Sequence, residues 1–176
     1  MPPVFENELP RSKLRGIYCH SGLDPESNLQ MDSRFRGNDA REAMTEAEIH
    51  RLGVQIIRDE LEREGWSILD INVNLKINPQ IIARKNGTLG HVLIRTACHP
   101  KKGRIEDDYI IERCLEHASQ LRAVCFFAGV RVSHAEASIR GEEQYMGTPI
   151  RGEGILVAYS GLEELRPDGV MTARGI

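Results

Sequence analysis

The clearest pattern of apolar and polar positions predicts an α-helix over residues 45–64. Within it, apolar side chains recur at the three- and four-residue intervals of one helix face; they are Ile49, Leu52, Ile56, Ile57 and Leu61. Thr45 and Glu48 fit a capping box, in which the threonine hydroxyl accepts from a first-turn N–H group and the glutamate reaches back. Gly65 follows as the expected C-terminal cap.

Three strands are expected after this helix, over residues 66–73, 81–85 and 89–97. Asn86-Gly87 lies between the second and the third and predicts a type I′ hairpin turn, because that turn needs positive φ at both central residues. The three strands can therefore form an antiparallel meander.

A second amphipathic helix is predicted over residues 106–121, and acidic residues at its start suit the helix dipole. Its apolar stripe is formed by Ile110, Ile111, Cys114, Leu115, Ala118 and Leu121. Strands are expected at 123–132 and 154–159, and the polar stretch 133–152 between them is expected to be irregular. Residues 161–165 are expected to add a helical turn.

This element order predicts an α/β fold of the α+β kind. A helix, a three-stranded antiparallel meander, a second helix and further strands would place both helices on a mixed sheet. We expect a single domain over residues 44–165 and a flexible tail over 166–176.

Residues 1–43 show neither a helical nor a strand period, so we expect a disordered or loosely ordered leader there. Two stretches within it are SGLDPES at 21–27 and DSRFRGND at 32–39. They resemble peptides translated from dispersed repeats in bacterial genomes. That resemblance implies an appended or mis-started leader, with Met44 as the expected original start.

Composition narrows the class of protein. The 176 residues are 40% hydrophobic and 28% charged with a net charge of −3, which fits one globular domain and excludes a globally basic nucleic-acid binder. No apolar run approaches the roughly 18–20 residues of a membrane span, so no membrane partner is expected. The absence of a hydrophobic signal core and of any C-x-x-C pair favours a cytoplasmic protein with reduced thiols.

One window of the chain is locally basic, because residues 71–105 contain no acidic side chain. We expect its cations to contact phosphates or a partner protein; the candidate binding residues are Arg84, Lys85, Arg95, Lys101, Lys102 and Arg104. The alternative is that the last three pair with Glu106, Asp107 and Asp108 or stay solvated. No aromatic platform for stacking on bases lies in this window.

The order of elements over residues 45–130 resembles the core of the restriction-endonuclease-like superfamily, the PD-(D/E)xK nucleases. The matching positions are Asn78-Pro79-Gln80 and Leu93-Ile94-Arg95. The resemblance implies an acidic residue near the second strand and a Glu-x-Lys on the third, which hold a metal ion and the attacking water. Here Gln80 offers only an amide oxygen, Leu93 offers no ligand, and Arg95 stays protonated.

We therefore expect no metal site, no cofactor and a loss of hydrolysis. Relocated ligands are the alternative, with Asp70, or Glu48 and Glu60 on the first helix, as the carboxylates. The residues that would carry any surviving catalysis are Asp70, Glu60, Gln80 and Arg95.

A second resemblance rests on Asn78-Pro79-Gln80, the run IRTACHP at 94–100 and the run YSGLEEL at 159–165. These residues are similar to those of short uncharacterised bacterial proteins, some of which carry the name of one component of the sodium-translocating NADH–quinone reductase. The true component needs an anchoring helix, a four-cysteine iron–sulfur site and flavin and nucleotide motifs. None of these occurs in the sequence, so that name would not describe its chemistry.

Two further places are candidates for chemistry. Cys98 and His99 are adjacent on a strand and would point to opposite faces, which disfavours a catalytic pair. His134 and Glu136 fall in the long polar stretch, where a binding role would explain its length. Three functions remain open: a non-catalytic module that binds nucleic acid or protein, a metal-dependent nuclease with relocated ligands, and a structural homodimer that pairs through a sheet edge.

Overall fold

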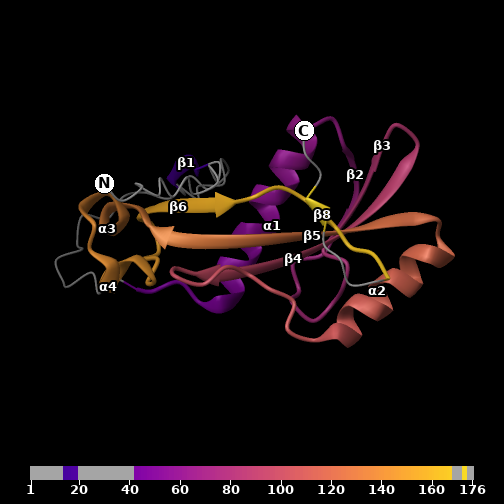
Figure 1. Ribbon diagram of the computed structural model, residues 1–176. Coiled ribbons are helices and arrows are strands. Elements are labelled where there is room, and N and C mark those ends of the chain that lie inside the picture. The colour runs from indigo at the N-terminus through magenta and orange to yellow at the C-terminus, as the bar shows by residue number, and fades with distance from the viewer. Residues whose placement is uncertain (1–13, 20–41, 168–171, 174–176) are drawn as a thin grey trace, which may run out of the picture.

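The computed structural model describes residues 14–19, 42–167 and 172–173, and Figure 1 shows their arrangement. In chain order the elements are β1 (Leu14–Cys19), α1 (Glu46–Arg63), β2 (Ser67–Ile71), β3 (Ile81–Lys85), β4 (Thr88–Cys98), α2 (Asp108–Gln120), β5 (Ala123–His134), α3 (Ala135–Arg140), α4 (Glu143–Met146), β6 (Gly154–Tyr159), β7 (Glu163–Glu164) and β8 (Thr172–Ala173). Within the described ranges the strands form one mixed sheet whose main path is β1-β6-β5-β4-β3-β2. The fold is thus of the α+β class, as predicted.

The start of α1 shows how local sequence sets an element. The backbone N–H of Glu48 donates to the hydroxyl of Thr45 at 3.3 Å, and the N–H of Thr45 donates to the Glu48 carboxylate at 2.8 Å. This reciprocal capping box confirms the predicted helix start. Gly65 follows the helix with a φ of +86°, a conformation that glycine adopts at little cost.

The predicted meander is confirmed, since β2, β3 and β4 pair antiparallel in that order. Asn86 and Gly87 have φ values of +50° and +79°, as a type I′ turn requires. β4 then pairs in parallel with β5, and α2 forms part of the connection between them. Figure 1 shows the hairpin and α2 at one end of the long sheet, with α3 and α4 at the other.

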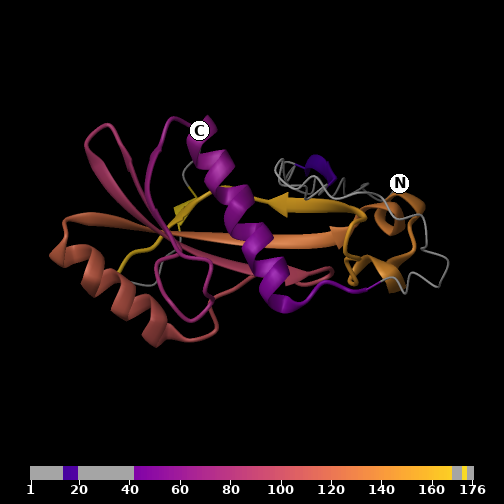
Figure 2. The same ribbon diagram turned by 180° about the vertical axis from the view of Figure 1, so that it is seen from behind.

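The two long helices lie on opposite faces of the sheet. Figure 2 shows α1 crossing in front of the strands, where it packs on Val92, Ile94 and Phe126 among others. The alternate strand positions, including Leu93 and Phe127, form a second core with α2. This alternation follows from the two-residue period of a strand, and it decides which face each polar residue of β4 and β5 reaches.

The prediction that residues 133–152 are irregular is wrong in part. β5 continues to His134, and α3 and α4 follow directly. The N–H of Ala137 donates to Nδ1 of His134 at 3.1 Å, so a histidine side chain caps α3. Histidine is not among the usual N-cap residues, which is why the sequence pattern did not indicate this helix.

The prediction of a helical turn at residues 161–165 is also wrong. Glu163 and Glu164 form β7, whose partners in β5 are Phe127 and Phe126. Gly161, with a φ of +103°, lies between β6 and β7, in a conformation that an L side chain rarely adopts.

The expected leader, residues 1–43, lies mostly outside the described residues. Within it, Leu14–Cys19 forms β1, which pairs antiparallel with β6. Most of the expected tail also lies outside the described ranges, although Thr172–Ala173 forms β8 beside β7. In the described part of the chain, no helix combines the length and the apolar character that crossing a membrane requires.

Candidate functional site

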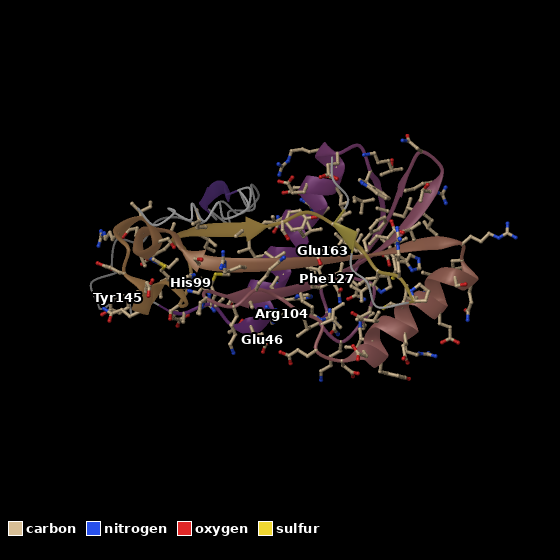
Figure 3. All side chains as sticks on the ribbon, viewed as in Figure 1. Glu46, His99, Arg104, Phe127, Tyr145 and Glu163 are labelled. Atoms are coloured by element: carbon tan, nitrogen blue, oxygen red, sulfur yellow. The ribbon has the colours of Figure 1, made fainter. Side chains whose placement is uncertain are left out.

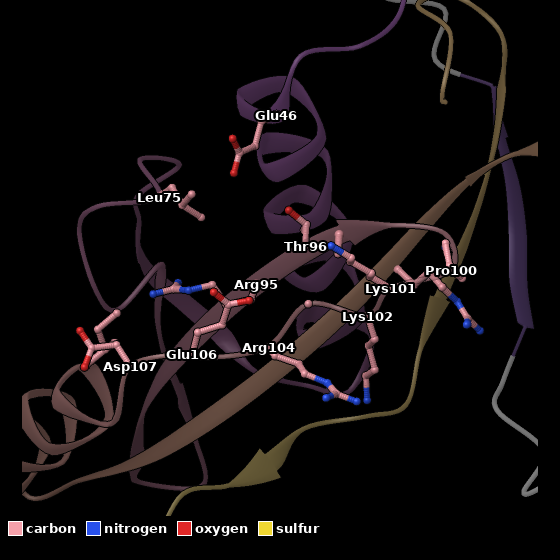
Figure 4. Close-up of a pocket in the computed structure, with 14 residues that line it drawn as sticks. Glu46, Leu75, Arg95, Thr96, Pro100, Lys101, Lys102, Arg104, Glu106 and Asp107 are labelled. Atoms are coloured by element: carbon pink, nitrogen blue, oxygen red, sulfur yellow. The ribbon is translucent and has the colours of Figure 1, made fainter. Parts of the chain in front are cut away.

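A cavity of about 900 Å³ opens on the α2 side of the sheet, where β4 runs past the first turn of α2. Figure 3 locates Arg104 midway along the sheet, between α2 at one end and α3 and α4 at the other. The cationic residues that line the cavity are Arg95, Lys101, Lys102, Arg104 and Arg131. Figure 4 shows how the first four are arranged around the opening.

Arg95 reaches the cavity because of the strand period. Leu93, two residues earlier on the same face of β4, is buried under α2. Arg95 is the next residue on this face, near the first turn of α2, and its side chain is half-buried. Burial lowers the pKa of Arg95 from its ordinary value, yet a guanidinium keeps its charge in proteins.

Only neutral groups hold the Arg95 guanidinium within the described part of the chain. Nη2 donates to Oδ1 of Asn78 at 3.0 Å, and Nη1 donates to the carbonyl of Ile94 at 2.9 Å and to Oε1 of Gln80 at 3.4 Å. No carboxylate of the described residues forms an ion pair with it. The positive charge is therefore fixed in position without being neutralised.

Gln80 has a structural role in this arrangement. Its side chain is fully buried, and Oε1 accepts from the backbone N–H of Ile94 at 2.8 Å. Nε2 donates to the carbonyl of Ile77 at 2.7 Å and to Oδ1 of Asn78 at 3.0 Å. The sequence resemblance placed Gln80 and Arg95 at a nuclease-like centre, and the structure does bring them together. Side-chain amides, and not metal-binding carboxylates, connect them.

The loop at residues 101–104 lies directly on the sheet. The N–H of Gly103 donates to the carbonyl of Val130 at 3.1 Å. A Cβ atom on Gly103 would lie 1.8 Å from the carbonyl oxygen of Arg95, and one on Gly129 would lie 2.7 Å from that of Gly103. Two glycines therefore allow the backbone contact that brings the loop cations over β4 and β5.

Lys102 ties the loop to the chain after β6. Its Nζ donates to Oγ of Ser160 at 2.6 Å and lies 3.5 Å from a carboxylate oxygen of Glu163. This contact spans the sheet surface from the loop to β7 and leaves the charge of Lys102 partly compensated.

The other loop cations are not compensated in this way. Lys101 and Arg104 are exposed and form no ion pair with any described residue. The alternative pairing with Glu106, Asp107 or Asp108 is not seen. Instead, Asp107 caps α2 by accepting from the N–H of Tyr109 at 2.9 Å.

Arg131 is a cavity residue that the sequence reasoning missed. In the parallel register it lies beside Ala97 of β4, which brings it onto the same face as Arg95. It forms no ion pair within the described ranges. The available signal was a single cation between Val130 and Val132 in an otherwise apolar strand.

Two helix starts also border the cavity. Glu46 is the first residue of α1, Asp107 is the N-cap of α2, and both line the cavity together with Glu106. A helix N-terminus carries a partial positive charge, which these three acidic side chains offset. The cavity therefore combines five cations with three acidic side chains, and Figure 4 shows Glu46, Glu106 and Asp107 among the cationic residues.

Two predicted binding residues do not belong to this site. Arg84 and Lys85 lie next to the β3–β4 turn, and the ammonium group of Lys85 lies 6.0 Å from the centre of the Trp66 ring. The six residue steps along β4 from Leu89, the partner of Arg84, to Arg95 correspond to about 20 Å at the rise of a strand.

The carboxylates considered as relocated metal ligands do not meet. Asp70 is exposed on β2, while Glu60 is buried and lies 2.7 Å from a guanidinium nitrogen of Arg63. Glu48 binds Arg151 through two contacts of 3.0 Å, and this pair, with the Thr45 N–H, lowers the pKa of Glu48 to about 2. None of the three lines the cavity, and the described residues contain no group of three or more potential metal ligands.

The remaining candidate residues have structural roles. Cys98 packs against the α1-side core, and burial raises the pKa of its thiol, which disfavours the thiolate. His134 caps α3 through Nδ1, and its Nε2 lies 2.5 Å from Glu153. Because Nδ1 accepts a hydrogen bond, the ring proton of neutral His134 belongs to Nε2.

A family model matches residues 47–165, which covers most of the chain. The chain belongs to the DUF8840 family, which is defined by a domain of unknown function. The DUF8840 region extends from α1 through β7 and contains all the cationic residues of the cavity. No curated protein and no solved structure matches the chain.

Proposed function

We propose that this chain is a non-catalytic binding module whose cavity engages the phosphate backbone of a nucleic acid. The observation that carries the proposal is the convergence of five cations on one cavity. Lys101, Arg104 and Arg131 have no ion-pair partner among the described residues, and Arg95 is held by neutral acceptors alone.

The charges suit a local rather than a global attraction. The chain has a net charge of −3, so its charge as a whole does not attract a polyanion. The cavity lining holds five cations against three carboxylates, so the potential there is opposite in sign to the net charge of the chain. Binding would then be directed to this site and weakened by salt, because phosphate contacts release condensed counterions.

The lining favours contact with phosphates over reading of bases. None of the described residues that line the cavity is aromatic, so they offer no ring on which a base can stack. Arginine and lysine contacts to phosphates position a nucleic acid without selecting its sequence. We therefore expect weak sequence preference.

We propose a module without catalysis because of the residues at the positions that correspond to the nuclease motif. Gln80 uses both side-chain atoms in protein hydrogen bonds, and Leu93 is fully buried. A hard divalent cation requires several oxygen ligands, and the matching positions offer only the amide oxygen of Gln80, which already accepts from the N–H of Ile94. A restriction-endonuclease-like scaffold that retains binding without hydrolysis is consistent with these residues.

Fluorescence anisotropy with a short labelled duplex DNA, and with the RNA duplex of the same sequence, tests the proposal. Binding that weakens steeply as salt rises is expected. No binding at low salt to either probe would overturn it. The same mixtures with magnesium or manganese report on the nuclease alternative, since cleavage that is lost in Asp70→Ala would contradict a non-catalytic role.

A further inference from the structure

Large apolar side chains are exposed along one edge of the sheet and in the turns that follow it. β2 is the last of the described strands on its side of the sheet, and the chain from Leu69 to Ile77 runs along and beyond it. The exposed members of this segment are Leu69 (51%), Ile71 (39%), Val73 (44%), Leu75 (37%) and Ile77 (48%). Five such residues within one short segment exceed the scattered single exposures normal for a protein surface.

The segment alternates strictly between apolar and polar positions. Between the five apolar residues lie Asp70, Asn72, Asn74 and Lys76. This is the pattern of a strand, yet β2 ends at Ile71. Residues 72–77 instead form turns, closed by the side chains of Asn72 and Asn74 and by the N–H of Ile77 on the carbonyl of Asn74.

The segment is also self-complementary when it is read in both directions from its centre. Around Val73, Ile71 mirrors Leu75 and Leu69 mirrors Ile77. The polar positions mirror in the same way, because Asn72 mirrors Asn74 and the anion Asp70 mirrors the cation Lys76.

We infer that residues 69–77 form an antiparallel strand pair with the same segment of a second copy of this chain, centred on Val73. Each apolar residue then faces an apolar residue, and two Asp70–Lys76 pairs form, one on each side of the twofold axis. A second copy fits better than an unrelated partner because the charge pattern complements itself.

The rearrangement that pairing needs is local. Residues 72–77 must extend, and the segment contains neither proline nor glycine to oppose that. The turns that open are closed by short-range hydrogen bonds, which the ladder between the two copies replaces. Extension also breaks at least one of two 2.7 Å bonds to Gln80, from the N–H of Asn72 to its carbonyl and from its Nε2 to the carbonyl of Ile77, because an extended segment is too long to keep both. Leu75 of this segment lines the cavity, whereas Asp70 and Lys76, the two residues changed in the test below, do not, so the test does not depend on ligand binding there.

Sedimentation velocity over a concentration series tests the inference on the full chain. The wild type is expected to dimerise reversibly. Asp70→Lys and Lys76→Asp each turn both cross-strand pairs into like-charge pairs and should raise the dimer Kd roughly tenfold. The double variant Asp70→Lys/Lys76→Asp restores opposite charges and should recover most of the affinity.

A cysteine scan supplies an independent measurement. Val73→Cys places two thiols across the twofold axis, where they can form an intermolecular disulfide under oxidation. Ile77→Cys is the matched control, because the two copies of residue 77 lie at opposite ends of the pairing. A wild type that is monomeric throughout, a double variant that does not recover, or equal cross-linking of both cysteine variants would each overturn the inference.

Discussion

Nη2 of Arg95 donates a 3.0 Å hydrogen bond to the side-chain oxygen of Asn78, so a half-buried cation is fixed by a neutral amide. Gln80 provides a second neutral acceptor, at 3.4 Å. In a nuclease-like centre, carboxylates at such positions would hold a metal ion. Here the same corner of the sheet presents an unneutralised positive charge to the cavity, which suits an anionic ligand.

Gln80 should therefore matter for stability. Gln80→Ala leaves the N–H of Ile94 without its 2.8 Å acceptor, and a buried unpaired group of this kind costs about 1–3 kcal/mol. We expect the free energy of unfolding, measured with urea, to fall by about that amount. Gln80→Met keeps most of the volume and should lose nearly as much. Wild-type stability in Gln80→Met would show that the hydrogen bonds are unimportant.

Gly103 should control the placement of the loop cations. Gly103→Ala puts a Cβ atom 1.8 Å from the carbonyl oxygen of Arg95, so the loop must lift from the sheet. The expected result is a loss of about 1–3 kcal/mol in the free energy of unfolding together with weaker DNA binding, although every charge remains. Lys101→Ala is the matched control, because it removes a charge and should leave stability unchanged. Wild-type stability and DNA binding in Gly103→Ala would contradict the contact between Gly103 and the sheet.

His91 should make the protein less stable in mild acid. Its ring is buried, neither nitrogen has a hydrogen-bond partner in the described ranges, and the His117 ring lies 5.2 Å away. Burial, and then His117, lower the pKa of His91 below its ordinary value of 6.5. The unfolded chain therefore binds more protons below about pH 6.5, and stability falls as the pH drops through that range.

His91→Leu removes this contribution. We expect urea unfolding between pH 7.5 and pH 5 to show a shallower decline in the variant, which should be at least as stable as the wild type at neutral pH. His50, whose pKa burial also lowers, remains in the variant and accounts for part of the residual slope. Identical slopes in the two proteins would contradict this role for His91.

The predictable parts of the fold are those set by neighbouring residues. The capping box at Thr45 and the turn at Asn86-Gly87 are local signals, and α1 and the β3–β4 hairpin follow them closely. The start of α3 depends instead on a histidine cap, and β7 depends on pairing with β5, a strand more than thirty residues earlier. Neither signal is contained in a short window of the sequence.

The candidate site was predictable only in part for the same reason. The acid-free window contains four of the five cavity cations, but it also includes Arg84 and Lys85, which the hairpin carries to the far end of β4. Arg131 joins the cavity through the parallel register of β4 and β5, which a linear window does not reveal. The contact of Gly103 with the sheet is likewise a consequence of tertiary packing.

The salt dependence of DNA binding tests the proposed function most directly. Lys101→Ala/Arg104→Ala removes two cavity cations, while Arg51→Ala/Arg84→Ala removes two exposed cations elsewhere and makes the same change in net charge. The slope of log Kobs against log salt should become shallower by about 2 in the cavity variant and stay at the wild-type value in the control. Equal slopes for the two variants would contradict binding in the cavity.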